Sequence, residues 1–203
     1  MINIAFTGHR PNKIYGYNIY SKQYEPLRDK LLEVFSYVED KYGEILNAYN
    51  GLALGFDTIA FEELYFSKRD TNIIGCIPFE KQASKWNKES VEVYNIMKSK
   101  CDEVVYVDTV DQYKVKNTIE GEYNVVKMMK RNELMIDNSN VLISCWNHEK
   151  KGGTWSAIRY ALQHDNIVEI ININPNTLEI EILKDRRWYY EKKINKRNNW
   201  GNK

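Results

Sequence analysis

The chain has 203 residues, of which 43% are apolar and 28% are charged, and its formal net charge at pH 7 is +1. These values are typical of a globular domain that buries a core, and they give no general case for binding nucleic acid or a membrane surface. Because no window approaches the ~18 consecutive apolar residues of a membrane span and no secretory leader is recognisable, we expect a cytoplasmic protein. Three widely separated cysteines indicate buried thiols rather than disulfides or a metal site.

Short apolar runs alternate with amphipathic segments along most of the chain. The pattern predicts, in order, strand 2–6, helix 27–42, strand 44–49, helix 58–68, strand 72–77, helix 88–100, strand 103–107, helix 122–137, strand 141–146, a helix from about 154, and strands 167–173 and 178–183 around a turn. Residues 108–121 show no period and predict a loop. In the helix at 122–137, we expect Val125, Val126, Met129 and Met135 on or near the buried side.

Strands that alternate with helices of this length imply right-handed crossovers and a parallel sheet that helices cover on both faces. We therefore predict an α/β fold with a doubly wound, mostly parallel sheet and a C-terminal antiparallel hairpin. Residues 1–183 form one predicted domain, and residues 184–203 form a basic, aromatic tail. In such sheets ligands bind beyond the carboxyl ends of the strands, so the loops that follow the strands are the candidate site.

The strand at 141–146 and the loop after it carry the clearest binding signal. Gly152, Gly153 and Thr154 lead from this apolar run into a helix, and Lys150 and Lys151 precede them. A helix N-terminus has unpaired N–H groups and roughly half a positive charge, and glycine lets a ligand approach the backbone closely. The stretch predicts either a phosphate-binding turn or a plain strand-to-helix turn, and the rest of the chain must decide between them.

Polar loops also follow the first three strands. Arg10 can place a planar fork on a phosphate or carboxylate, and His9 beside it is either a second donor to that anion or an ordinary packed histidine. Asp57 fits either a helix N-cap or an acceptor for a ribose hydroxyl. Phe79 is either a stacking partner for a base or a core residue, and Gln82 either reads a base edge or is merely exposed.

In their order and spacing these loops resemble the SLOG superfamily, and most of all its YpsA-like branch. The matching segments are Thr7-Gly8-His9-Arg10, Gly51-Leu52-Ala53-Leu54-Gly55-Phe56-Asp57, Ile77-Pro78-Phe79-Glu80-Lys81-Gln82 with Trp86, Arg131-Asn132 and Gly152-Gly153-Thr154. The resemblance spans about residues 1–173 and leaves out the tail. It implies a Rossmann-like fold, related to the Lonely Guy and DprA proteins, that binds nucleotides or nucleotide-derived signals.

The resemblance also implies which residues form the ligand site. The expected ligand-binding residues are Gly8, His9, Arg10, Asn50, Gly51, Gly55, Asp57, Pro78, Phe79, Gln82, Arg131, Asn132, Trp146, Gly152, Gly153 and Thr154. Arg131 is expected to contact phosphate, as an arginine in the equivalent place does in the Lonely Guy phosphoribohydrolases. We expect no metal and no cofactor.

Catalysis by the route of those phosphoribohydrolases requires a glutamate in the helix after the glycine turn. Here no acidic residue follows Thr154 until Asp165, and the turn is shorter than the family's Pro-Gly-Gly-x-Gly-Thr. Asp57 and Glu62 are the nearest substitutes, and nothing in the sequence selects either of them. We therefore assign no catalytic residue and expect a binding protein.

Three functions follow from these residues. The first is a sensor or a sequestering sponge for an ADP-ribose-like signal, in bacterial stress or in phage defence and anti-defence. The second is a nucleotide N-glycosidase. The third is a single-stranded nucleic-acid binder acting through residues 184–203, which carry eight basic and two acidic residues, a net charge of +6. We expect a small nucleotide-derived ligand rather than nucleic acid or membrane, and a homodimer or homotetramer.

Overall fold

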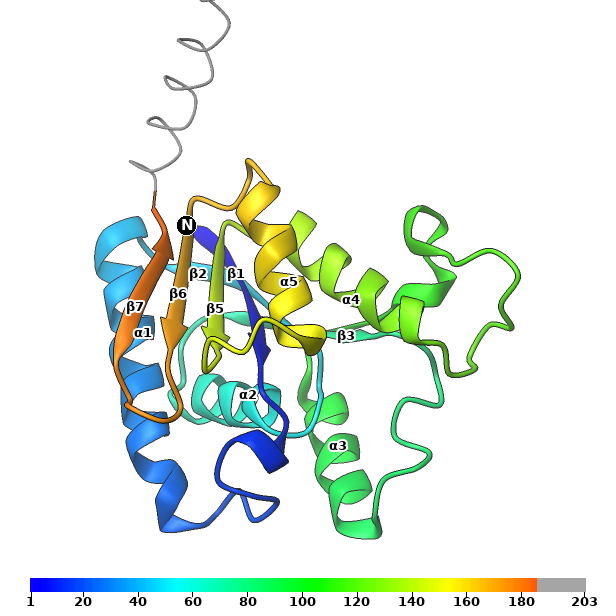
Figure 1. Ribbon diagram of the computed structural model, residues 1–203, viewed down its shortest axis with the longest axis horizontal. Coiled ribbons are helices and arrows are strands. Elements are labelled where there is room, and N and C mark those ends of the chain that lie inside the picture. Colours follow the sequence, from blue (N-terminus) through cyan, green and yellow to red (C-terminus); the bar gives the residue numbers. More distant parts are fainter. Residues whose placement is uncertain (186–203) are drawn as a thin grey trace, which may run out of the picture.

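The protein, described here by a computed structural model over residues 1–185, is built on one seven-stranded sheet (Figure 1). The strand order is β4-β3-β2-β1-β5-β6-β7, and only β7 is antiparallel to its neighbour among these strands. The strands are β1 (Ile2–Gly8), β2 (Ile45–Asn50), β3 (Asn72–Ile77), β4 (Glu103–Tyr106), β5 (Val141–Cys145), β6 (Glu169–Ile173) and β7 (Ile180–Lys184). The predicted fold class is confirmed, including the antiparallel hairpin at the sheet edge. The predicted tail lies outside the described residues from 186 onward.

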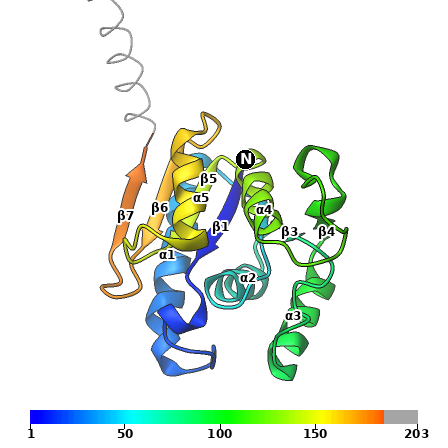
Figure 2. The same cartoon turned by 45° about the vertical axis from the view of Figure 1, so that its right-hand side comes forward.

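Helices cover both faces of this sheet, as Figures 1 and 2 show. They are α1 (Glu25–Tyr42), α2 (Phe56–Phe66), α3 (Lys88–Lys100), α4 (Val125–Asp137) and α5 (Gly152–Gln163). Short 3-10 helices at Pro11–Lys13, Lys22–Tyr24, Val107–Thr109 and Asp111–Tyr113 interrupt the loops, so the stretch predicted as a loop at 108–121 contains two of them. Within residues 1–185, no helix is long and apolar enough to cross a membrane.

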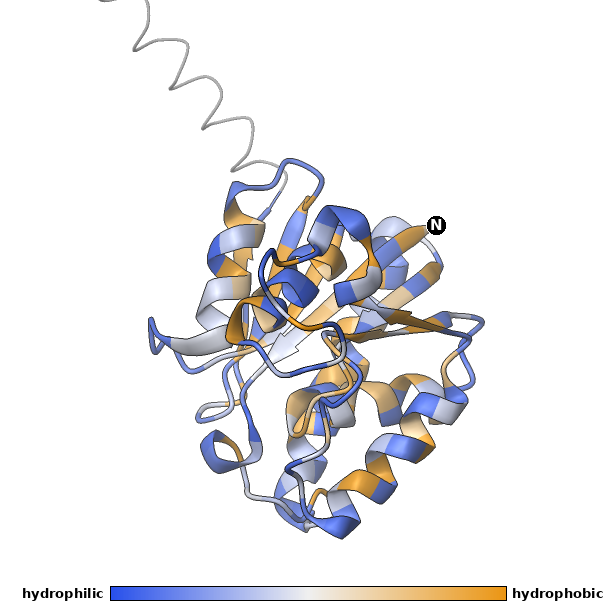
Figure 3. Ribbon diagram, turned by 90° about the vertical axis from the view of Figure 1, so that its right-hand side faces the viewer, coloured by the Kyte–Doolittle hydropathy of each residue, from blue (hydrophilic) through white to orange (hydrophobic). Residues whose placement is uncertain are grey.

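The core divides into two layers because successive residues of a strand point to opposite faces. Ile4 and Phe6 of β1 pack in the layer with α1, α2 and α3, and Ala5 packs in the layer with α4 and α5. The central strands β1, β5 and β6 are buried on both faces, as the continuous apolar runs predict for a parallel sheet, whereas the edge strands β4 and β7 are partly exposed. Figure 3 shows apolar residues gathered in the central strands, whereas the helices carry polar residues along one side.

The chain reverses its winding direction at β1. Strands β2, β3 and β4 follow one another on one side of β1, and β5 then pairs with its other side. At such a switch point the two neighbouring loops diverge to opposite faces, and a crevice opens between them. The loops after β1 and β5, at the lower edge of the sheet in Figure 1, therefore flank this crevice.

Helix α4 turns a different side inward than the sequence pattern predicts. Val125, Val126 and Met129, expected on or near the buried side, are 58%, 40% and 44% exposed, although Met135 is buried as expected. Two charged residues, Lys127 and Arg131, are buried instead. The prediction was wrong for the first three because both inward cations have partners inside the protein, which a count of apolar residues does not detect.

The partner of Lys127 is Asp108. Their side chains are 2% and 3% exposed, and the Nζ to Oδ2 distance is 2.8 Å. Lys127 Nζ also donates to the carbonyl oxygens of Ile119 and Glu122, and the Gly121 amide donates to Asp108 Oδ2 at 2.8 Å. This buried pair therefore ties the loop before α4 to the first turn of the helix.

We expect Asp108→Ala to lower the free energy of unfolding by about 3–5 kcal/mol, because it leaves the Lys127 charge buried without its partner. Glu33→Ala is the matched control, since it breaks the exposed Lys30–Glu33 pair on α1 and is expected to cost ~0.5 kcal/mol or less. Urea denaturation measures both values. Equal losses in the two variants would show that the buried pair does not hold the loop.

Candidate functional site

A cavity of about 540 Å³ lies at the switch point, beyond the carboxyl ends of β1 and β5. Its wall combines the loop after β1, the turn before α2, one side of α4 and the start of α5. The lining residues are Phe6, Thr7, Gly8, His9, Arg10, Asn12, Lys13, Ala53, Asp57, Val125, Met128, Met129, Arg131, Asn132, Lys151, Gly152, Gly153, Thr154 and Ser156. We call this cavity the switch-point pocket.

Helix α5 begins on the wall of the pocket without a side-chain cap. Lys151 occupies the N-cap position and makes no capping hydrogen bond through its side chain. Gly152 has a φ of +82°, which favours glycine, and a Cβ atom added at Gly152 or Gly153 would meet nothing within 4 Å. The first turn of the helix therefore has no side-chain cap, and its residues Gly152, Gly153 and Thr154 line the pocket, as an anion site requires.

Arg131 reaches the pocket from α4 and is only 7% exposed. Its Nη1 donates to the Gly51 carbonyl oxygen at 2.8 Å and lies 3.7 Å from Asp57 Oδ2, while Nε donates to Asn132 Oδ1 at 2.9 Å. Gly51 is required for this approach, because a Cβ atom there would lie 1.6 Å from Arg131 Nη1. One guanidinium thus connects α4 with the turn after β2 and the start of α2.

Arg10 and Asp57 complete the charged part of the wall. Burial lowers the pKa of Arg10, with Asp57 acting against this and Arg131 adding to it, but the guanidinium stays charged at neutral pH. Burial raises the pKa of Asp57, and Arg131 and then Arg10 act in the opposite direction. Two guanidiniums therefore act on one buried acidic side chain, whose ion-pair partner is Arg131 at 3.7 Å, and the wall keeps an excess of positive charge.

The loops after β1 and β5 contact each other directly. His9 Nε2 lies 2.7 Å from Asn147 Oδ1 and 3.1 Å from the Asn147 amide nitrogen, and burial lowers the pKa of His9, so its ring is neutral at pH 7. Glu149 pairs with Lys13 on one side and with Lys151, at 2.6 Å, on the other. These hydrogen bonds lower the pKa of Glu149 to about 2, so the carboxylate holds both lysines at the pocket rim across the physiological range.

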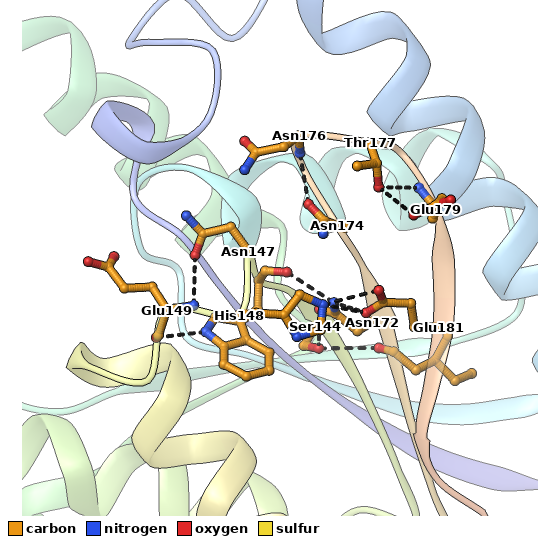
Figure 4. A network of polar contacts seen from close by, with 12 residues as sticks. Ser144, Asn147, His148, Glu149, Asn172, Asn174, Asn176, Thr177, Glu179 and Glu181 are labelled. Carbon is orange, nitrogen blue, oxygen red and sulfur yellow. Dashed lines mark hydrogen bonds and ion pairs between the residues drawn. The ribbon is translucent and has the colours of Figure 1, made fainter.

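A polar network behind the pocket fixes the loop after β5 (Figure 4). Asn172 on β6 accepts from Ser144 Oγ at 2.8 Å, and its Nδ2 donates to the Trp146 carbonyl oxygen and to Glu181 Oε2, each at 3.0 Å. Trp146 Nε1 in turn donates to the Glu149 carbonyl oxygen at 2.9 Å. The position of the loop is therefore determined by β6 and β7 as well as by its own turn.

Comparison with known proteins identifies the family to which this pocket belongs. The sequence model of the YpsA family, described as the YspA SLOG family, matches residues 4–178. The chain belongs to the SLOG family. This is a family of Rossmann-like, nucleotide-binding proteins, and the resemblance recognised in the sequence is confirmed.

Two known proteins are similar to this SLOG chain. The uncharacterized SPbeta prophage-derived protein YoqJ of Bacillus subtilis (strain 168) is 35% identical over 142 residues, which cover 66% of this chain and 80% of YoqJ. The crystal structure of DNA processing protein A (DprA) from Streptococcus pneumoniae superposes with a TM-score of 0.51 at 15% identity and covers 80% of this chain. The chain spans about half (47%) of DprA, and this likeness supports the fold alone.

Many of the residues expected to bind ligand line the switch-point pocket of this SLOG domain. They are Gly8, His9, Arg10, Asp57, Arg131, Asn132, Gly152, Gly153 and Thr154. The structure thus brings Arg10, Asp57, Arg131 and Thr154 to one cavity. Whether they bind a ligand stays a prediction.

The other expected residues lie outside the lining, and several of them support it from behind. They are Asn50, Gly51, Gly55, Pro78, Phe79, Gln82 and Trp146. Asn50 Nδ2 donates to the Asp57 carbonyl oxygen at 2.9 Å, and Gln82 Nε2 donates to the Gly51 carbonyl oxygen at 3.2 Å. Phe79 is buried against Tyr123, with ring centroids 5.6 Å apart.

Several lining residues were not among those expected from the sequence. Asn12 and Lys13 follow Pro11 in a short 3-10 helix. Val125 and Met129 of α4 were expected on or near the buried side of the helix, and Met128 was not assigned to either side. In the sequence, Asn12 and Lys13 lie close to Arg10, and the three α4 residues lie close to Arg131. Closeness in the sequence does not show which side of α4 faces the pocket.

We expect Gly51→Ala to lower the free energy of unfolding by about 1–3 kcal/mol, because the new methyl group overlaps the Arg131 guanidinium and lies 2.7 Å from Asp57 Oδ2. Gly153→Ala is the matched control, since its methyl group would meet open space, and we expect its stability to be unchanged or slightly raised. Thermal and urea unfolding compare the two. A Gly51→Ala protein as stable as Gly153→Ala would contradict the close packing described for Arg131.

Proposed function

We propose that this SLOG protein binds a nucleotide or nucleotide-derived signal, of the ADP-ribose type, in the switch-point pocket. The observation that carries the proposal is the meeting of an uncapped helix start with two guanidiniums in one cavity. Backbone N–H groups and arginine forks are the groups that proteins use for phosphate, and both are preorganised here. Asp57 is the carboxylate among the lining residues, and a ribose hydroxyl is the part of a nucleotide that it would accept.

The apolar side of the pocket supports a nucleotide over inorganic phosphate. Val125, Met128 and Met129 of α4 form part of the wall, and the thioethers of methionine make favourable contacts with aromatic rings. A base against α4 and a phosphate at the start of α5 would use both parts of the wall. The cavity volume is also within the range of small-molecule sites, roughly 300–1,000 Å³.

As biological context, we propose a sensor or a sequestering sponge in phage defence or anti-defence. The similarity to a prophage-derived protein supports this context. A sensor and a sponge need the same pocket, and they differ in what the bound protein does next. Comparing phage infection of cells that do and do not express the protein would separate a defence role from an anti-defence role.

We expect Arg10→Ala to weaken ligand binding by about 10- to 150-fold, the equivalent of losing one charge-assisted hydrogen bond of ~1.5–3 kcal/mol. Isothermal titration calorimetry with nucleotides and cyclic ADP-ribose isomers identifies the tightest ligand and measures the loss. Lys150→Ala is the control, because Lys150 lies outside the pocket lining, with its Nζ 5.9 Å from the Trp155 ring centroid. Binding no tighter than millimolar, or equal binding by both variants, would contradict the proposal.

The nucleotide N-glycosidase remains the alternative function. A hydrolytic site needs a carboxylate close to the ribose, and Asp57 is the acidic residue in the described lining. Glu62, the other substitute, is held by Arg28 at 2.6 Å and does not line the pocket. Chromatography of mixtures with nucleoside monophosphates or NAD would reveal any free base. The nucleic-acid alternative depends on the tail, most of which lies outside the described residues.

We further propose that two copies associate through the exposed side of α4 and the loop before it. This region carries five exposed apolar side chains, Ile119, Tyr123, Val125, Val126 and Met129, of which Val125 and Met129 also line the pocket. A two-fold contact there would bury this surface and narrow the opening of both pockets.

We expect Val126→Glu to convert the dimer to a monomer, measured by light scattering on a sizing column. Val126 lies outside the pocket lining, so the change does not remove a ligand contact. Ile96→Glu on α3, which is exposed elsewhere, is the control and should leave the mass unchanged. A wild-type protein that is monomeric at high concentration would exclude this contact.

A further inference from the structure

A second cavity, of about 340 Å³, adjoins the switch-point pocket. It is lined by Pro11, Tyr17, Asn18, Ile19, Tyr20, Leu54, Gly55, Thr58, Asn87, Glu89, Ser90 and Val93. The two cavities use consecutive residues of the same two turns. Arg10 and Ala53 line the switch-point pocket, and the residues that follow them, Pro11 and Leu54, line the second cavity. We call the second cavity the tyrosine pocket.

Two exposed aromatic rings distinguish this pocket from its surroundings. Tyr17 and Tyr20 are 65% and 74% exposed, although they line a cavity. Tyr20 is held in place by its amide, which donates to Asn18 Oδ1 at 3.1 Å, and by its hydroxyl, which lies 3.4 Å from Glu62 Oε1. Exposed aromatic faces on a fixed backbone are suited to stacking on a planar ring.

The loop that carries these tyrosines is anchored at several points. Tyr24 Oη donates to the Gly16 carbonyl oxygen and Tyr15 Oη to the Pro175 carbonyl oxygen, each at 2.5 Å. Arg28 Nη2 donates to the Ile19 carbonyl oxygen at 3.2 Å. The pocket is therefore formed without a ligand, and binding would not have to order this loop.

Polar groups in the lining can recognise the edge of such a ring. Asn87 caps α3 through Oδ1, which accepts from the Ser90 amide at 2.8 Å, and this leaves its Nδ2 as a donor. The Nδ2 of Asn18 is free in the same way, since no described residue accepts from it. Ser90 adds a hydroxyl group to the lining.

Arg10 lies at the boundary of the two cavities, because it lines the switch-point pocket and the next residue, Pro11, lines the tyrosine pocket. A phosphate bound to Arg10 would be close to the boundary that the two cavities share.

We propose that the tyrosine pocket receives an aromatic ring of the same ligand whose anion occupies the switch-point pocket. The ligand class is a nucleotide with a planar ring at each end of a pyrophosphate. One ring would lie against α4 and the other between Tyr17 and α3. This inference rests on the proposed function, which supplies the anion site.

The test is calorimetry with two probes, pyrophosphate and NAD, the second of which carries a ring at each end of a pyrophosphate. Ser90→Trp fills the tyrosine pocket without touching the lining of the first. Ser99→Trp, on the exposed side of the same helix, is the matched control. We expect Ser90→Trp to weaken NAD binding at least tenfold and to leave pyrophosphate binding within twofold, and Ser99→Trp to change neither. Tyr17→Ala should weaken NAD binding about fivefold or more.

The two probes distinguish a failure of the tyrosine pocket from a failure of the anion site. Equal NAD binding by wild type, Ser90→Trp and Tyr17→Ala overturns the tyrosine pocket and leaves the anion site standing. Binding of NAD that Ser90→Trp weakens, with no pyrophosphate binding by the wild type, supports the tyrosine pocket and contradicts the anion site. If neither probe binds the wild type, both proposals fail.

Discussion

The geometry of the site depends on the contacts of the buried Arg131 guanidinium with Gly51 and Asp57. The guanidinium joins a helix on one face of the sheet, α4, to the turn after β2 and to the first turn of α2 through Gly51 and Asp57. A buried charge is tolerated only when hydrogen bonds and an opposite charge compensate it. Asp57 compensates one positive charge, and Arg10 brings a second into the same cavity. An anion bound in the pocket would compensate this second positive charge.

Polar contacts outside the cavity hold the loops that line it in fixed positions. The Asn172 network holds the loop after β5, and the Lys127–Asp108 pair holds the loop before α4. Neither group of contacts lines the pocket, yet each determines where a lining segment begins. Preorganised donors avoid part of the entropy that a flexible site loses on binding. This suits a protein whose proposed role is to capture a scarce signal.

The structure gives different physical reasons for glycine at the positions of the family motifs. Gly8 and Gly55 allow close packing, because an added Cβ would lie 2.4 Å from Phe56 Cβ and 2.5 Å from the His9 carbonyl oxygen, respectively. Gly51 makes room for Arg131, and Gly152 and Gly153 face open space. Only the last pair has open space where a Cβ atom would be. The sequence pattern alone treats all five alike.

The sequence determined the alternation of strands and helices, and with it the parallel sheet and the edge at which polar loops gather. That much follows from local periodicity and from the handedness of the crossovers. It also singled out Arg10 and the turn at Gly152, because each follows a predicted strand, whereas Arg131 was expected only from the family resemblance. The family resemblance gave the kind of ligand.

Only the tertiary structure decided which of these loops meet. The order β3-β2-β1-β5 places the loop after β3 two strands away from the switch point, so Phe79 and Gln82 are outside the pocket lining. Helix α4 buries Lys127 and Arg131 and exposes Val125 and Met129, because buried ion pairs across the fold outweigh the local apolar pattern. Charge pairing between distant segments leaves no period in a sequence, whereas apolar burial within one helix does.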